Sequence, residues 1–286
     1  MDWSDRAAWL LMAALATIVF LYLRLMRKNK RLHQLANEAN RQRRIAEETE
    51  QRNRQLKQEM TSNIAHELKT PVSSIRGFLE ILINRSLDET RRHDYLERCY
   101  KQTLRLSDLI ADVSLINKIE ESTDLFPKTD IYIDRIAQEA IDELSEKASA
   151  SSITIENRLG NLPIHGNHEL IFCIFRNLIE NSVTYAGRGV QIVIETYEVP
   201  HHPGVAVEPN NYHLHYYDTG NGVPDEYLSR LFDRFVRIGE GRSRRDGGTG
   251  LGLSIVKHAV QFHGGEIYAK NRPQGGLEYY FSLNKQ

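Results

Sequence analysis

The first 70 residues contain neither glycine nor proline, the two residue types that most readily interrupt a helix. The first proline is Pro71. Residues 1–70 are therefore predicted to form one nearly continuous helix, about 100 Å long at about 1.5 Å per residue. The full length of 286 residues leaves room for two ordinary domains after such an appendage.

An uncharged, almost wholly apolar run occupies residues 7–23. Its length is near the lower limit of roughly 17 residues for a membrane-spanning helix. Only Arg6 precedes the run among basic residues, whereas five follow it closely: Arg24, Arg27, Lys28, Lys30 and Arg31. This asymmetry predicts a single-pass transmembrane anchor over residues 1–26, with residue 24 onward in the cytoplasm. A buried helix of a soluble protein is the alternative.

Residues 27–59 are highly charged and carry a loose heptad repeat. Its repeating positions are Leu25, Leu32, Ala39, Ala46, Asn53 and Met60. Because the middle of the repeat is polar or alanine-rich, we expect a weak coiled-coil linker that can change register cheaply. A passive solvated spacer is the alternative.

Two helical stripes in residues 60–120 predict a helical hairpin. The first stripe is Ile64, Leu68, Ile75, Leu79 and Leu82, and the second is Leu96, Cys99, Leu106, Leu109, Val113 and Ile116. Residues 86–90 read as a turn, with Asp88 as a helix N-cap. Two helices alone bury little apolar surface, so we expect a homodimer in which two hairpins form a four-helix bundle.

Helix and strand patterns mix in residues 126–286, after a linker over residues 120–129. We expect helices at 131–147, 169–185 and 249–262, strands at 152–156, 190–197 and 212–218, a loop at 199–211, and a terminal hairpin turning at Gly275–Gly276. This mixture predicts an α/β sandwich.

The overall charge is close to neutral, at −1, which argues against nucleic acid as a partner. Cys99 and Cys173 lie in apolar helical segments and are expected to be reduced core thiols. His213 and His215 would share one strand face, but no cysteine or carboxylate cluster accompanies them, so a metal site there is not favoured.

Four short strings suggest chemistry: His66-Glu67-Leu68-Lys69-Thr70 before Pro71, Asn177-Leu178-Ile179-Glu180-Asn181, Asp218-Thr219-Gly220-Asn221-Gly222, and Gly248-Thr249-Gly250-Leu251-Gly252-Leu253. Each string alone is a weak pattern. In this order, over residues 60–286, they resemble the bacterial membrane-bound sensor histidine kinases. The resemblance implies a dimerisation and histidine phosphotransfer hairpin followed by a catalytic α/β sandwich of the Bergerat ATP-binding fold. It also implies that the membrane anchor lies in the inner membrane of a bacterium.

The first string, residues 66–70, has the residue types of a phosphoryl-accepting segment. A phosphoryl-accepting imidazole must face solvent, and His66 lies beside the apolar stripe rather than in it. The resemblance implies that His66 accepts the phosphoryl group on Nε2 and that Glu67 takes the Nδ1 proton as general base. It further implies that Thr70, one turn after His66, positions water for a reverse phosphatase reaction. Thr70 also removes the second histidine that a zinc-protease motif would need.

Glycines allow close backbone approach to phosphates, and Gly248, Gly250 and Gly252 open a predicted helix, whose N-terminus favours anions. The resemblance makes Asp218 the carboxylate that binds the adenine amino group, with Gly220 and Gly222 passing close to the base.

Asn177 and Asn181 are four residues apart and share a helix face, and amide oxygens suit Mg²⁺. By resemblance Asn181 is the principal Mg²⁺ ligand with Asn177 assisting, and Tyr185 lies against the adenine. Thr184 stands where the family usually has lysine or arginine, which removes an expected phosphate contact.

We call residues 248–253 the glycine box. The resemblance also implies roles for residues in the segment that precedes it. Phe232 and Phe235 match the aromatic anchors of a mobile lid over residues 238–247, and Arg237 matches a basic residue that can reach the γ-phosphate.

The implied activity is ATP-dependent autophosphorylation of His66, followed by transfer to an aspartate of a response-regulator receiver domain. Two alternatives stay open. A related ATP hydrolase usually carries glutamate four residues before the Mg²⁺-binding asparagine, and this chain has Asn177 there. A degenerate membrane scaffold would bind a regulator without transferring phosphate.

Overall fold

A computed structural model describes residues 3–121, 123–197, 210–238 and 248–285. Most of the expected loop at 199–211 and of the expected lid at 238–247 lies outside these residues. The chain divides into two compact units, residues 1–62 and residues 63–286.

The first unit is helical. Helix α1 covers Trp3–Asn84, so the helix predicted from the absence of glycine and proline is confirmed and continues through Pro71. Exposed ion pairs one turn apart, such as Arg43 with Glu47, run along it, and pairs of this kind add little stability singly. Within the described part of the chain, no helix is both long and apolar enough to cross a membrane. Most side chains of residues 7–23 fall outside that description.

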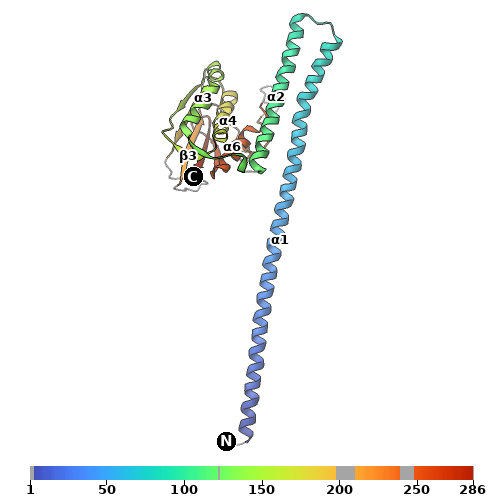
Figure 1. The fold of residues 1–286 in the computed structure, drawn as a ribbon, viewed down its shortest axis with the longest axis vertical. Helices are drawn as coiled ribbons and strands as arrows, with labels where there is room; N and C mark the ends of the chain where they lie inside the picture. Colours follow the sequence, from blue (N-terminus) through green and yellow to red (C-terminus); the bar gives the residue numbers. More distant parts are fainter. Residues whose placement is uncertain (1–2, 122, 198–209, 239–247, 286) are drawn as a thin grey trace. The chain divides into compact units, whose positions relative to one another are not determined.

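The second unit begins with a helical hairpin, as predicted. The end of α1 and helix α2 (Glu89–Glu121) run antiparallel and are joined by a short turn (Figure 1). Asp88 caps α2, because its Oδ1 accepts a hydrogen bond from the backbone N–H of Arg91 at 2.8 Å. The rings of Phe78 and Tyr95 lie 5.8 Å apart and are in contact between the two helices.

The remainder is an α/β sandwich, which confirms the expected architecture. Five strands form one sheet in the order β2-β4-β5-β7-β6, parallel only between β2 and β4. They are β2 (Thr154–Asn157), β4 (Gln191–Thr196), β5 (Asn211–Asp218), β6 (Ile267–Asn271) and β7 (Leu277–Asn284). The helices are α3 (Ile133–Ala150), α4 (His168–Tyr185), α5 (Asp225–Leu228) and α6 (Gly252–Phe262), with a 3₁₀ turn, η1, at Thr123–Leu125.

The core lies between helices α3, α4 and α6 and one face of the sheet. Fully buried side chains from both layers meet there, including Phe175 of α4 and Phe281 of β7, whose rings are 6.2 Å apart. Burial of these apolar side chains is the main force holding the layers together.

The structure corrects several expected boundaries. A small second sheet pairs β1 (Thr129–Tyr132) with β3 (Pro163–Gly166), and neither strand was expected. Tyr132 is extended, so α3 begins at Ile133 rather than at 131. Helix α6 begins at Gly252 rather than at 249. Strands β1 and β3 were missed because each is only four residues long, which leaves too few positions for an alternating pattern to be recognised.

Candidate active site

The proposed phosphoacceptor lies on an exposed face of α1. His66 is exposed, as the sequence predicted, whereas Pro71 is buried. The hydroxyl of Thr70 donates to the backbone carbonyl of His66 at 3.3 Å. Thr70 is four residues after His66 in α1, so these two side chains lie on the same helix face.

A cavity of about 350 Å³ opens beside this histidine. It joins α1 to the segment that follows α5. Its lining residues are Asn63, His66, Glu67, Tyr227, Arg230, Arg234, Phe235, Val236 and Arg237. Three arginines thus face the same space as the histidine. A basic cavity of this kind can hold the charge of a phosphoryl group.

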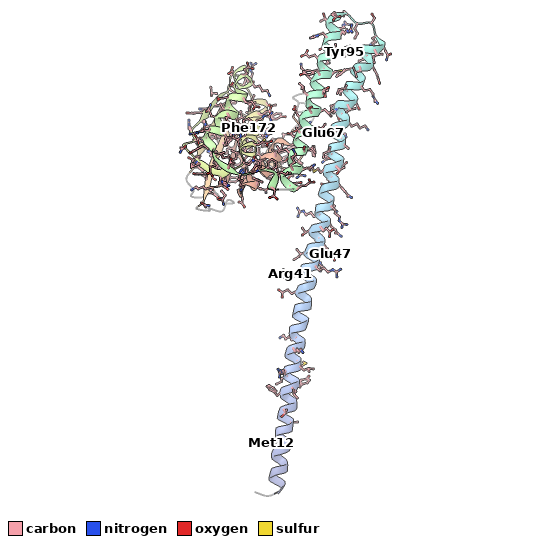
Figure 2. The ribbon with its side chains drawn as sticks, in the orientation of Figure 1. Met12, Arg41, Glu47, Glu67, Tyr95 and Phe172 are labelled. Carbon is pink, nitrogen blue, oxygen red and sulfur yellow. The ribbon has the colours of Figure 1, made fainter. Side chains whose placement is uncertain are left out.

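Glu67 is half-buried and already paired. Figure 2 labels Glu67 on α1. Its Oε2 lies 3.1 Å from Arg237 Nη2 and 3.5 Å from Nη2 of Arg105, a residue of α2. Arg237 also donates to the carbonyl of Gly248. The expected general base and the expected γ-phosphate contact therefore neutralise each other in this conformation.

Helix α4 carries the two asparagines. Asn177 donates from Nδ2 to the carbonyl of Cys173 at 2.8 Å, which leaves its Oδ1 facing Gly252 at the start of α6. A Cβ on Gly252 would lie 2.6 Å from that oxygen. Asn181 is one turn further along α4 and is partly buried. The shared helix face is confirmed, and the glycine at 252 is what allows α6 to approach α4 this closely.

Asp218 ends strand β5 and is buried, with 4% of its surface exposed. Its Oδ2 accepts a hydrogen bond from Ser182 Oγ at 2.8 Å, and its Oδ1 accepts from the backbone N–H of Gly220 at 2.9 Å. Tyr216 Oη lies 3.0 Å from Ser182 Oγ, and complete burial holds the pKa of this tyrosine well above its usual range. The network fixes the carboxylate at the end of β5, the central strand of the sheet.

Two glycines near Asp218 lie so close to backbone carbonyl oxygens that a residue with a side chain would not fit at either position. A Cβ on Gly220 would lie 2.3 Å from the carbonyl oxygen of Ala186, at the end of α4. A Cβ on Gly276 would lie 1.9 Å from the carbonyl oxygen of Asp218, and Gly276 has φ +102. The turn after β5, the end of α4 and the start of β7 are therefore in direct contact.

The glycine box before α6 meets the aromatic anchors. The backbone N–H of Phe235 donates to the carbonyl of Gly250 at 2.8 Å, and Phe235 itself has φ +63. Phe232 packs edge-on against Tyr279 of β7. A Cβ on Gly248 would lie 2.7 Å from the hydroxyl of Tyr185. The structure thus brings Tyr185, Phe235 and the glycine box together, while Thr184 is exposed nearby.

Sequence reasoning missed the hairpin carboxylates that contact this region. Asp112 of α2 accepts a hydrogen bond from Thr249 Oγ1 at 2.7 Å. Burial raises the pKa of Asp112 above its ordinary value. The second helical stripe includes Leu109, Val113 and Ile116, so an acidic residue on the same part of α2 was the available signal.

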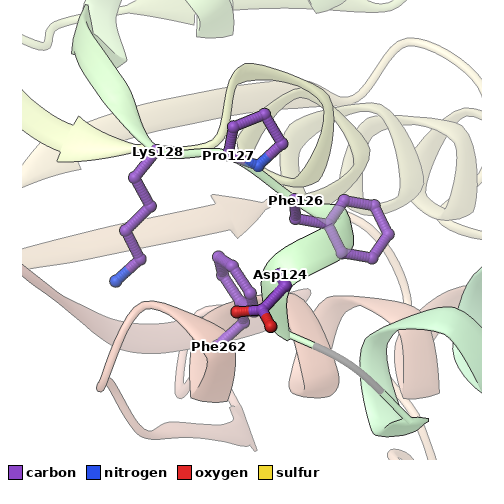
Figure 3. A pocket seen from close by; sticks show the side chains of 5 residues that line it. All are labelled: Asp124, Phe126, Pro127, Lys128 and Phe262. Atoms are coloured by element: carbon purple, nitrogen blue, oxygen red, sulfur yellow. The ribbon is translucent and has the colours of Figure 1, made fainter.

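A second cavity, of about 500 Å³, lies at the linker rather than near the nucleotide strings. Figure 3 shows Asp124, Phe126, Pro127 and Lys128 around Phe262 of α6. The Lys128 ammonium lies 5.3 Å from the ring centroid of Phe262, and Phe126 meets that ring edge-on. The linker is thus packed against the end of α6.

The fold and the site define a class: an α/β ATP-binding domain attached to a helical hairpin that carries an exposed histidine. Two family models match the chain. Residues 56–122 match the His Kinase A (phospho-acceptor) domain, and residues 166–286 match the histidine kinase-, DNA gyrase B- and HSP90-like ATPase domain. The chain belongs to the sensor histidine kinases that combine these two domains.

Individual relatives agree with this membership. Sensor-like histidine kinase SenX3 of Mycobacterium tuberculosis is 30% identical over 230 residues, covering 79% of this chain and 53% of SenX3. Drug sensory protein A of Synechocystis is 31% identical over 235 residues, covering 80% of this chain and 35% of that protein. The chain therefore spans about half the length of SenX3 and less of the second relative.

Solved structures share the fold. Histidine kinase AdeS of Acinetobacter baumannii superposes with a TM-score of 0.59 at 21% identity, covering 77% of this chain and 98% of AdeS. Histidine kinase ThkA, solved in complex with response regulator protein TrrA, superposes with a TM-score of 0.61 at 22% identity, covering 80% of this chain and 61% of ThkA.

Proposed function

We propose that this chain is an ATP-dependent protein-histidine kinase that phosphorylates His66 and passes the phosphoryl group to an aspartate of a response regulator. One observation carries the proposal: the exposed imidazole of His66 shares a cavity with Arg230, Arg234 and Arg237 of the ATP-binding domain. Phosphoryl transfer depends mainly on positioning and on neutralising charge. The cavity places the histidine beside three arginines, and Arg237 would neutralise phosphate charge once its ion pair with Glu67 is exchanged.

The chemical step balances with the groups at hand. His66 Nε2 attacks the γ-phosphorus of ATP, the bond from that phosphorus to the β–γ bridging oxygen breaks, and ADP leaves. The Nδ1 proton passes to Glu67, which must first exchange its ion pair with Arg237 for the imidazole. Arg237, once released, is free to reach the γ-phosphate. Thr70 is proposed to position water for the reverse phosphatase reaction.

The residues around the glycine box fit a nucleotide. Asp218 is proposed to accept a hydrogen bond from the adenine amino group, with Tyr185 against the ring and Gly220 and Gly222 close to the base. The backbone of Gly248, Gly250 and Gly252 is proposed to approach the phosphates, since α6 begins there and has no acidic residue in its first turn.

Asn181, assisted by Asn177, is proposed to hold Mg²⁺ through its amide oxygen. Asn177 uses its amide nitrogen on Cys173, which orients its oxygen toward the glycine box. Bound Mg²⁺ would neutralise phosphate charge. Phe232 and Phe235 are proposed to anchor the lid over residues 238–247.

A homodimer is supported by apolar side chains that the single hairpin leaves exposed. Val72, Leu79 and Ile83 of α1 are 51%, 43% and 79% exposed, and they recur at helical spacing. Leu96 and Tyr100 of α2 are 48% and 63% exposed. A four-helix bundle formed by two hairpins would bury these surfaces.

The proposed domain organisation is a transmembrane anchor (1–26), a coiled-coil linker (27–59), the dimerisation and phosphotransfer hairpin (60–120) and the catalytic domain (126–286). The apolar run at 7–23 and the basic residues after it support an anchor whose catalytic part is cytoplasmic. A receiver domain as partner is supported by ThkA, whose structure contains the response regulator TrrA.

The test uses the full chain in detergent, incubated with γ-labelled ATP and Mg²⁺. We expect protein-bound label that is acid-labile and base-stable, absent in His66→Gln and retained in His93→Gln. His93 is a matched control because it is an exposed histidine of the same hairpin. Free phosphate without bound label would identify a hydrolase instead, and neither product would identify a scaffold.

A further inference from the structure

Three carboxylates of the hairpin hold groups of the ATP-binding domain that surround the proposed phosphate site. Glu67 of α1 pairs with Arg237. Asp112 of α2 accepts from the hydroxyl of Thr249. Glu120, near the end of α2, pairs with Arg234. The hairpin therefore presents negative charge to the side of the ATP-binding domain that would meet the phosphates.

The contact through Asp112 is the most direct of the three. Thr249 is inside the glycine box, and its Oγ1 accepts a hydrogen bond from the backbone N–H of Leu251 at 3.2 Å while it donates to Asp112 at 2.7 Å. The carboxylate thus orders the loop that opens α6. It does so at the end of the helix where the macrodipole favours an anion.

Apolar side chains seal the same contact. Leu109 and Ile116, one turn on either side of Asp112, are 4% and 0% exposed. They pack with Leu251, the residue before α6, and with Ile255 of α6, which are 0% and 1% exposed. Asp112 is consequently removed from much of the solvent that would screen its charge, and burial raises its pKa.

ATP would bring several negative charges to this segment. A triphosphate at Gly248–Gly252 would lie beside a half-buried carboxylate, and like charges in a poorly solvated site repel each other. The glycine box can therefore bind either the charged Asp112 carboxylate or the charged phosphates favourably, but binding both at once is opposed by the repulsion between their negative charges.

We infer that Asp112 competes with the phosphates of ATP for the glycine box, so that docking of α6 on α2 weakens ATP binding and ATP binding releases the docked contact. This inference rests on the proposed function. It assigns Asp112 as a positioning residue that couples nucleotide binding to movement of the ATP-binding domain away from the hairpin, a movement that also frees Arg237 from Glu67.

The test compares nucleotides of different charge on the full chain in detergent with Mg²⁺. Asp112→Asn keeps the size of the side chain and an acceptor for Thr249 while removing the charge. We expect its Kd for ATP to fall about tenfold, the size expected of one close charge interaction. Its Kd for adenosine, which has no phosphate, should stay within about twofold of wild type. Asp108→Asn, one turn earlier and exposed, should change neither constant.

The outcomes separate cleanly. Equal ATP affinity in wild type and Asp112→Asn, or an equal change for ATP and adenosine, overturns the inference and leaves the proposed function standing. Failure of both proteins to bind ATP overturns the proposed function and the inference together.

A measurement on the wild type guards against a misfolded variant. Cys173 packs against the sealed contact, and burial raises its pKa to about 11, whereas Cys99 belongs to the hairpin alone. We expect ATP, but not adenosine, to accelerate alkylation of Cys173 relative to Cys99. An unchanged or slower rate with ATP contradicts release of the contact.

Discussion

His263 is a buried histidine whose protonation should control the stability of the ATP-binding domain. It follows α6 and is 1% exposed. Its Nδ1 lies 2.8 Å from the carbonyl oxygen of Ala259, and its Nε2 lies 3.0 Å from the backbone nitrogen of Asn167. A carbonyl only accepts and an N–H only donates, so the ring is neutral, with its proton on Nδ1. Asn167 in turn caps α4, the helix of the proposed Mg²⁺ ligands.

The size of the stability loss on acidification follows from the pKa of the His263 imidazole. Burial, with a smaller contribution from the charge of Lys128, lowers the pKa of His263 to about 4. The unfolded chain has an ordinary value of about 6.5 and therefore binds the proton more readily. Stability is complete above about pH 6.5 and is lost as the pH falls toward 4. The loss is about 2 kcal/mol by pH 5 and about 3 kcal/mol by pH 4.

The assay is urea unfolding at pH 7 and pH 5, followed by the near-ultraviolet circular dichroism of the tyrosines. His263→Gln can accept the Asn167 hydrogen bond but does not titrate. We expect the wild type to lose about 2 kcal/mol more than this variant between the two pH values, because carboxylate titration is common to both and cancels. His93→Gln, an exposed control, should behave as wild type. If His263→Gln loses as much stability on acidification as the wild type, the imidazole is not held neutral and the reasoning is wrong.

Four further substitutions test the site and the hairpin. Asp218→Asn replaces an acceptor-only group by an amide and should weaken ATP binding at least tenfold, measured by calorimetric titration. Gly276→Ala would place a Cβ 1.9 Å from a backbone oxygen, at a residue with φ +102. This substitution should lower the free energy of unfolding by more than about 2 kcal/mol. Gly77→Ala is the control, because Gly77 lies in open space within α1, and it should raise the free energy of unfolding by up to about 1 kcal/mol. Asp88→Ala removes the cap of α2 and should cost about 1 kcal/mol in chemical denaturation. A neutral Gly276→Ala or an unaffected Asp88→Ala would contradict the geometry described here.

Much of the fold could be predicted because local chemistry decided it. The absence of glycine and proline before Pro71 predicted a continuous helix, since nothing in that stretch interrupts backbone hydrogen bonding. Asp88 predicted a helix start because its side chain satisfies a free N–H. The strands β1 and β3 were missed because they are only four residues long and pair with each other across more than 30 positions of sequence.

The candidate site was predictable only in part. The exposed histidine and the asparagine pair follow from helical periodicity, which any reader of the sequence can apply. The pairing of Glu67 with Arg237, and of Asp112 with Thr249, joins residues separated by 170 and 137 positions. No local pattern encodes such contacts.

By itself, the amino-acid sequence determined where helix α2 begins, which helix faces are apolar and in what order the four motif strings occur, because hydrogen-bond capping and side-chain periodicity act within a few residues. Only the tertiary structure decided which carboxylate meets which part of the ATP-binding domain. Ion pairs and hydrogen bonds act over a few ångströms, and packing of distant helices alone brings those charges together.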